Sequence, residues 1–212
     1  MYAGQKMNTS DNRYQVVLFP MDCMYITQGE YGSVSHTLAM DFVGWNPQSG
    51  QIAHYSYFAP VDMKCVAYNP YQAWYIWESL NPVYYADGTV DYITLCVMHD
   101  DNPPHSVGDI VLQGDLLGRT GSSGYATGDH AHFNLARGQY AGWTTGMQFN
   151  ELKNSIHLYD GFYVNDTTLY NDYGYAWKTY QGGIVPPTPT PTNKKKKFPW
   201  FIYSQRRLNN LT

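Results

Sequence analysis

Short apolar segments that alternate at period two dominate this chain, and helical periodicity is scarce. Gly, Asn, Asp and Pro separate these segments at intervals of about eight to twelve residues, as in proteins built from short strands and tight turns. Because successive side chains of a strand point to opposite faces of a sheet, this pattern predicts an all-β fold. We expect one short helix around Phe149–Ser155 and strands at Tyr14–Leu18, Met40–Val43, Val61–Tyr68, Ala73–Trp77, Val90–Val97, Ile110–Leu112 and His130–Leu135.

The composition excludes several other classes of protein. Tyr, Phe and Trp make up 17% of the 212 residues, whereas charged residues make up only 14%. A chain so rich in aromatic residues is not expected to be disordered, and it lacks the long polar and leucine-rich runs of a coiled coil. No apolar run reaches the ~18 residues of a membrane span, and residues 1–10 lack the apolar core of a secretory signal. We therefore expect a protein made in the cytoplasm without a signal peptide.

The net charge of −4 is unevenly distributed along the chain. Six of the 13 basic side chains lie in residues 194–212, where there is no acidic side chain. Residues 1–193 therefore carry seven basic against 17 acidic side chains. Because nucleic-acid affinity comes mainly from the neutralisation of phosphates, we expect no nucleic acid as a partner of this acidic body.

A proline-rich segment divides the chain. Residues 186–193 read PPTPTPTN, and alternating prolines fix φ and remove backbone donors, so an extended linker is expected there. The sequence thus predicts a domain over residues 1–185, this linker, and a basic and aromatic tail at residues 194–212. Within the domain, the motifs described below lie at about residues 20–136, and a tyrosine-rich extension follows at 137–185.

Histidines form the most informative pattern in the domain. His130 and His132 occupy positions i and i+2 of an expected strand in GDHAHFNL, so both imidazoles project from one face, about 7 Å apart. In that arrangement one imidazole ligates a metal ion while the other reaches a water molecule on that ion. The alternative is that the two histidines only form a pair on a solvated face of the strand. Upstream, SHTLAMDF contains His36 and Asp41, which offer ligand atoms of the kinds that zinc accepts. His99 ends the apolar segment YITLCVMH, at a position from which a side chain can enter a cleft.

Three segments together resemble the lysostaphin-type zinc endopeptidases of bacterial cell walls. These are ITQGEYGSVSHTLAMDF, APVDMKCVAY and VGDIVLQGDLLGRTGSSGYATGDHAHFNL, and the likeness covers about residues 20–136. The part GRTGSSGYATGDHAHF matches the closing motif of the family nearly residue for residue. The resemblance implies an all-β fold of antiparallel sheets, similar to a barrel-sandwich hybrid, with long aromatic loops.

Carried over by position, the resemblance implies that His36, Asp41 and His132 ligate one Zn²⁺ ion. It implies that His99 and His130 are the catalytic histidines, facing the water that completes the coordination. The family usually places three residues between its first histidine and the aspartate, whereas this chain has four. We expect a bulge or a looser loop to accommodate the additional residue.

Three further residues are candidates for substrate binding. Tyr31, five residues before the first expected ligand, is a candidate oxyanion donor. Gly121 and Gly124 are expected to let their loop approach an extended peptide closely, because neither carries a side chain.

The resemblance implies a zinc-dependent endopeptidase that cleaves peptide cross-links or stem peptides of bacterial peptidoglycan. Since no export signal is evident, we expect a bacteriophage enzyme that acts at the cell wall, either as a tail-associated lysin at entry or as an endolysin released at lysis. Residues 194–212 are then expected to bind a virion tail protein, and the alternatives are an anionic membrane surface, the polyanions of the wall or the acidic body itself. The alternatives are a non-catalytic wall-binding or structural virion component on the same fold, and a biotinyl or lipoyl carrier module. A carrier lysine sits at a hairpin tip, whereas Lys64 lies inside an expected strand.

Overall fold

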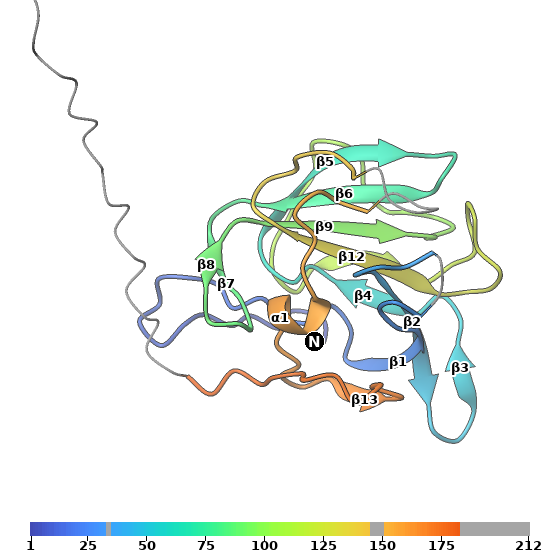
Figure 1. The fold of residues 1–212 in the computed structure, drawn as a ribbon, viewed down its shortest axis with the longest axis horizontal. Coiled ribbons are helices and arrows are strands. Elements are labelled where there is room, and N and C mark those ends of the chain that lie inside the picture. The colour runs from blue at the N-terminus through green and yellow to red at the C-terminus, as the bar shows by residue number, and fades with distance from the viewer. Residues whose placement is uncertain (33–34, 145–150, 183–212) are drawn as a thin grey trace, which may run out of the picture.

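A computed structural model describes residues 1–32, 35–144 and 151–182 (Figure 1). The predicted all-β class is confirmed, because these ranges contain thirteen strands and one helix of four residues. The helix is α1 (Leu158–Gly161), and the strands are β1 (Cys23–Gln28), β2 (Met40–Asn46), β3 (Gly50–Ile52), β4 (Ser56–Phe58), β5 (Met63–Asn69), β6 (Trp74–Ser79), β7 (Val83–Tyr84), β8 (Val90–Asp91), β9 (Ile93–Met98), β10 (Ile110–Val111), β11 (Leu116–Arg119), β12 (Ala131–Arg137) and β13 (Thr168–Tyr170).

One large sheet organises the described part of the molecule. Its strand order is β10-β5-β6-β9-β12-β2-β1-β13, and β3 pairs with β2 beside this path. The pairs are antiparallel except for β1 and β13, which run parallel. Figure 1 shows β5, β6, β9 and β12 side by side, with β13 at the other end of the molecule. Two small antiparallel pairs, β4 with β11 and β7 with β8, complete the strands.

The core lies against one face of β12 and its neighbours. Phe133 packs edge-on against Phe19 and Tyr57, with ring centroids 6.1 and 5.4 Å apart. Phe19 makes a similar contact with Phe42 on β2. Aromatic pairs in such arrangements contribute about 0.5–1.5 kcal/mol each beyond the burial of their area. Because side chains alternate along β12, burial of Phe133 directs His132 to the opposite face of the sheet.

Three expected elements differ from the structure, and one of them, the strand expected at Val90–Val97, is divided into β8 and β9 of different sheets. Residues 14–18 form only isolated bridges, through Gln15, Val16 and Leu18, because Val16, Val17 and Leu18 are all fully buried instead of alternating. The helix expected at 149–155 is wrong over its described part, residues 151–155, which contain a turn and isolated bridges. Asn154 has a φ of 62°, which interrupts a right-handed helix. The remainder of that segment lies outside the described residues.

The tyrosine-rich extension packs onto the same body up to residue 182. Strand β13 pairs with β1, and Trp177 packs edge-on against Phe19. The expected linker at 186–193 and tail at 194–212 lie outside the described residues, so the domain boundaries stay a prediction. In the described ranges, no helix is long and apolar enough to cross a membrane.

Candidate metal centre

The register of three neighbouring strands brings the predicted site residues together. Asp41 on β2 lies directly opposite His132 on β12, and His132 lies opposite Met98 at the end of β9. His99 follows Met98 at once, so it projects beside the same strand ends. The pairing of β1 with β2 shifts register where Gln28 lies opposite Asp41, an irregularity of the kind expected near the additional spacer residue.

The three predicted ligands converge on one point. Asp41 Oδ1 lies 3.4 Å from His36 Nε2 and 3.1 Å from His132 Nδ1. One ligand atom from each residue lies within 4.8 Å of the other two. Zinc–nitrogen and zinc–oxygen bonds of about 2.0–2.1 Å at tetrahedral angles place ligand atoms roughly 3.3 Å apart. The observed separations therefore match the requirements of a single ion.

Burial of His36 and the histidines around Asp41 favour the protonation states that bind a cation. Desolvation, together with neighbouring His132, lowers the pKa of His36 to about 4, so this imidazole is neutral at pH 7. Its Nδ1 atom is buried and has no hydrogen-bond partner among residues 1–32, 35–144 and 151–182. Burial raises the pKa of Asp41, but the hydrogen bond with His132 and the charges of the nearby histidines outweigh it, so the pKa lies below its ordinary value. Neutral imidazole and ionised carboxylate are the forms that bind metals.

The two predicted catalytic histidines lie beside this point, and each is held through its Nδ1 atom. His99 Nδ1 donates to the carbonyl of Ser123 and His130 Nδ1 donates to the carbonyl of Gly128, both at 2.8 Å. A neutral imidazole that donates through Nδ1 leaves Nε2 free to accept a proton. His130 Nε2 lies 3.7 Å from Asp41 Oδ2, and the rings of His99 and His130 are 4.5 Å apart. Burial lowers the pKa of His99 to about 4.

The backbone of His99 has a strained conformation, and hydrogen bonds hold both its N–H and its carbonyl group. Its φ is 80°, an uncommon conformation for a residue with a side chain. Its N–H donates to Ala73 and its carbonyl accepts from Ser123. A side chain at Gly121 would collide with the carbonyl of His99, so only glycine fits there. Strain of this kind persists where the surrounding structure determines the conformation, which here fixes the imidazole.

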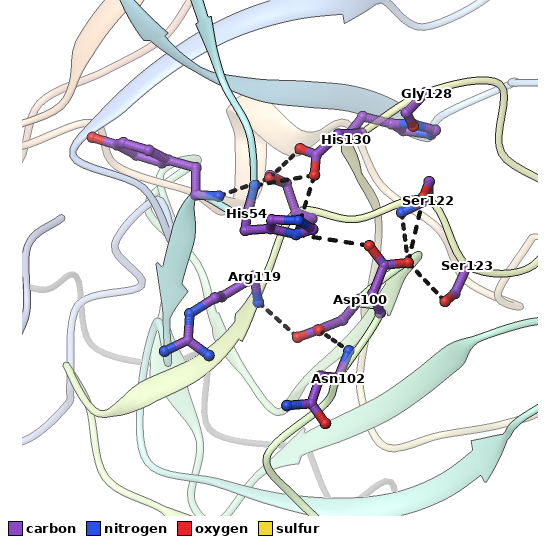
Figure 2. Close-up of polar contacts among 12 residues, drawn as sticks. His54, Asp100, Asn102, Arg119, Ser122, Ser123, Gly128 and His130 are labelled. Atoms are coloured by element: carbon purple, nitrogen blue, oxygen red, sulfur yellow. Dashed lines mark hydrogen bonds and ion pairs between the residues drawn. The ribbon is translucent and has the colours of Figure 1, made fainter.

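A carboxylate behind His99 holds the turn that carries its acceptor. Asp101 Oδ1 accepts hydrogen bonds from Ser122 N at 3.0 Å and from Ser123 Oγ at 2.8 Å. In Figure 2, dashed lines run from Ser122 and Ser123 to one carboxylate. Because the Ser123 carbonyl accepts from His99 Nδ1, Asp101 acts on the orientation of His99 through the turn.

A second carboxylate, Asp129, holds the residues around His130. It accepts hydrogen bonds from Thr120 Oγ1 at 2.5 Å and from the backbone N–H of His54 at 3.0 Å. The exposed His54 imidazole lies 3.4 Å from Asp129 and 3.7 Å from Asp101, so it connects the two carboxylates (Figure 2). The sequence analysis missed this network, because its partners are distant in sequence and have no characteristic spacing.

A cavity of about 600 Å³ opens above the metal centre. Its polar end contains His36, Asp41 and His132, and it is also lined by His99 and His130. Its lining also includes aromatic and apolar side chains, which are Trp74, Met98, Tyr125 and Trp143. The Trp74 and Trp143 rings lie 5.2 Å apart, and Tyr125 is 80% exposed. The cavity therefore places a polar metal centre beside an aromatic surface.

The three candidate substrate-binding residues lie outside the described lining of this cavity. Tyr31 is 67% exposed, and its N–H donates to the carbonyl of Thr37. Gly121 exchanges backbone hydrogen bonds with His130, and a side chain at Gly124 would lie 2.7 Å from the carbonyl of Gln72. Both glycines thus let backbone segments of the site pack closely, and their contact with substrate stays a prediction.

Comparison with known proteins finds no matching family model. The chain is 43% identical to morphogenesis protein 1 of Bacillus phage B103 over 168 residues, which are 78% of this chain and 44% of the relative. The chain therefore spans less than half of the length of that homologue.

Solved structures with similarity to the chain include three peptidases. The catalytic domain of lysostaphin from Staphylococcus simulans is 21% identical, with a TM-score of 0.39, over 54% of this chain and 79% of that one. A putative peptidase M23 from Pseudomonas aeruginosa is 17% identical, with a TM-score of 0.43, over 74% and 52%. A zinc-containing peptidase from Vibrio cholerae is 17% identical, with a TM-score of 0.40, over 72% and 39%. Lysostaphin, whose family the sequence motifs resemble, is thus among the similar structures.

Proposed function

We propose that this homologue of morphogenesis protein 1 of Bacillus phage B103 is a zinc-dependent endopeptidase that cleaves peptide cross-links or stem peptides of bacterial peptidoglycan. The observation that carries the proposal is the convergence of His36, Asp41 and His132, with the His99 and His130 rings beside them. Three protein ligands leave a coordination position open, which distinguishes catalytic zinc sites from structural ones.

The side chains divide the proposed reaction between them. Zn²⁺ held by His36, Asp41 and His132 supplies Lewis-acid polarisation of a carbonyl and a lowered pKa for water. His99 or His130 accepts the proton of the attacking water at Nε2, since Nδ1 of each is engaged by a carbonyl. The imidazolium so formed stabilises negative charge on the carbonyl oxygen and then protonates the leaving amine.

The name of the phage homologue supports a place in the virion. We propose that the protein acts at the bacterial cell wall as a component of the phage tail, or after release at lysis. Residues 194–212, with six basic side chains and several aromatic ones, are the proposed contact with a virion tail protein. The acidic body makes nucleic acid an unfavourable partner.

A structural role without catalysis is the second candidate. The word morphogenesis in the name of the homologue favours it, because it denotes assembly and says nothing of hydrolysis. The two functions differ in one measurable property. A structural protein binds or is incorporated without breaking bonds, whereas a peptidase releases new amino groups from the wall.

The test combines zinc analysis with wall digestion. We expect about one zinc per purified chain, new amino termini from isolated peptidoglycan, and loss of this activity with a chelator. His132→Ala removes a ligand and should abolish both zinc binding and cleavage. His130→Ala should retain zinc and lose most turnover, roughly 100-fold or more, because it removes only a proton-transfer group. Mass spectrometry of the released fragments identifies the bond that is cleaved.

Two outcomes would contradict these assignments. Zinc-replete protein that binds peptidoglycan without releasing amino groups would establish the structural alternative. Equal loss of zinc in the two histidine variants would show that His130 is also a ligand, and the division of roles given above would be wrong.

A further inference from the structure

We propose that Glu151 positions two of the metal ligands by holding the backbone between them, an inference that rests on the zinc site proposed above. His36 and Asp41 are separated by four residues, one more than is usual in the family that the sequence resembles. The first three of these, Thr37, Leu38 and Ala39, precede β2 and belong to no strand. No sheet ladder therefore fixes the distance between the two ligands.

Hydrogen bonds to the carboxylate of Glu151 hold these three residues instead. Glu151 Oε1 accepts from the backbone N–H groups of Thr37 at 2.6 Å, Leu38 at 3.0 Å and Ala39 at 3.3 Å. Glu151 Oε2 accepts from Leu38 as well, at 3.1 Å. Three successive amides thus point at one anion, an arrangement that stabilises negative charge and fixes the dihedral angles of the segment.

Both the charge and the length of the Glu151 side chain suit these three donors. Glu151 is 8% exposed, and of the three residues whose amides it accepts, Ala39 is buried and Thr37 and Leu38 are half-buried. A glutamine keeps one acceptor oxygen but loses the negative charge, and its N–H₂ group replaces the oxygen that accepts the second bond from Leu38. An aspartate keeps the charge but is one methylene shorter, so it cannot reach the same three amides.

Glu151 is itself attached to the strand that carries the third ligand. Its carbonyl accepts from Thr144 N at 2.7 Å, and the next N–H, that of Leu152, donates to Asn134 Oδ1 at 2.7 Å. Asn134 lies on β12, two residues after His132. The segment around Glu151 therefore connects the residues between His36 and Asp41 to β12, which carries His132. One set of hydrogen bonds thus links the backbone near all three predicted ligands.

The expected consequence is a loss of zinc affinity without the loss of a ligand. Partners that orient ligands from outside the coordination shell typically change metal affinity by about 10–100-fold when they are replaced. We expect Glu151→Gln to weaken zinc binding by this factor. Glu151→Asp should weaken zinc binding as well, because the carboxylate must reach the three amides and its charge alone does not hold them.

Glu78 provides a matched control. Its carboxylate also accepts a backbone N–H, that of Tyr140 at 2.5 Å, but it lies on β6 and does not line the described cavity. Glu78→Gln removes the same charge as Glu151→Gln without touching the spacer between the ligands. We expect its zinc affinity to equal that of the wild type.

The experiment measures zinc dissociation constants by competition with a chromophoric chelator, for the full-length wild type and these three variants. Circular dichroism of the metal-free proteins establishes that each variant is folded. If Glu151→Gln does not fold, the zinc affinity of Glu151→Asp is the deciding measurement. Wild-type affinity in a folded Glu151 variant overturns the inference and leaves the zinc site intact. Equal weakening by Glu78→Gln and Glu151→Gln overturns it in favour of a general effect of charge. A wild type without zinc affinity overturns the proposed function and this inference together.

Discussion

His36 and His99 make the stability of the metal-free protein sensitive to pH. Burial lowers the pKa of each to about 4, whereas a histidine of the unfolded chain titrates near 6.5. Between these values the unfolded chain binds protons that the folded chain does not, so stability falls as the pH falls. We expect the thermal unfolding midpoint of metal-free protein to decrease between about pH 6.5 and 5, measured by calorimetry in one buffer series.

A substitution separates this effect from the titration of other groups. His99→Gln removes one of the two buried imidazoles while it keeps a polar side chain of similar reach. The dependence of the midpoint on pH should become shallower in this variant, because one fewer proton is bound on unfolding. An identical slope in the variant and the wild type would show that His99 does not titrate differently in the two states.

At the scale of elements, the turn between β11 and β12 determines where His99 points. Asp101 holds this turn through Ser122 and Ser123, and the Ser123 carbonyl accepts from His99 Nδ1. We expect Asp101→Ala, which removes this acceptor, to lower kcat on a soluble wall peptide by roughly 10–100-fold, since a small displacement of a catalytic group has effects of this size. KM and zinc content should stay unchanged, because no ligand or cavity-lining side chain is altered.

Asp109→Ala is the control for this prediction. Asp109 also accepts a backbone N–H within a turn, that of Ser106 at 2.9 Å, but this turn lies next to β10 at the edge of the sheet. Its replacement should leave kcat unchanged. If both variants lose kcat and thermal stability in parallel, Asp101 serves only the general stability of a turn.

Strands and turns also show which features of the fold and the site could be predicted from the sequence and which could not. Alternation along His130–Leu135 predicts that His130 and His132 share one face, and both line the cavity. The family resemblance, and not the spacing of the histidines, implied the set of His36, Asp41 and His132, whose candidate ligand atoms lie within 4.8 Å of one another. Short strands such as β4 and β11 were missed because they offer too few residues for a period to be recognised. Glu151 was missed for another reason. Its partners are backbone amides 112–114 residues away, and such contacts leave no pattern in side-chain identity.

At the scale of the molecule, the extension after β12 belongs to the body that carries the site. Parallel pairing joins β13 to β1, the strand next to β2. Trp177 packs on Phe19 with ring centroids 5.6 Å apart, and Tyr180 packs on Tyr163 at 5.5 Å. These contacts extend almost to the last described residue, so the stabilising interactions of the domain continue at least to about residue 180.

This arrangement predicts different effects for two truncations. A chain that ends at residue 185 retains every contact named for the cavity, so its unfolding midpoint, zinc affinity and cleavage of soluble wall peptide should match the full chain. Its association with a virion tail protein should be lost, because residues 194–212 are removed.

A chain that ends at residue 167 lacks β13 and Trp177, and we expect a loss of stability on the order of 3 kcal/mol or more. Thermal unfolding and peptide hydrolysis of the three proteins check this directly. A folded 1–185 chain with bound zinc and no hydrolysis would instead show that the C-terminal residues help to form the site.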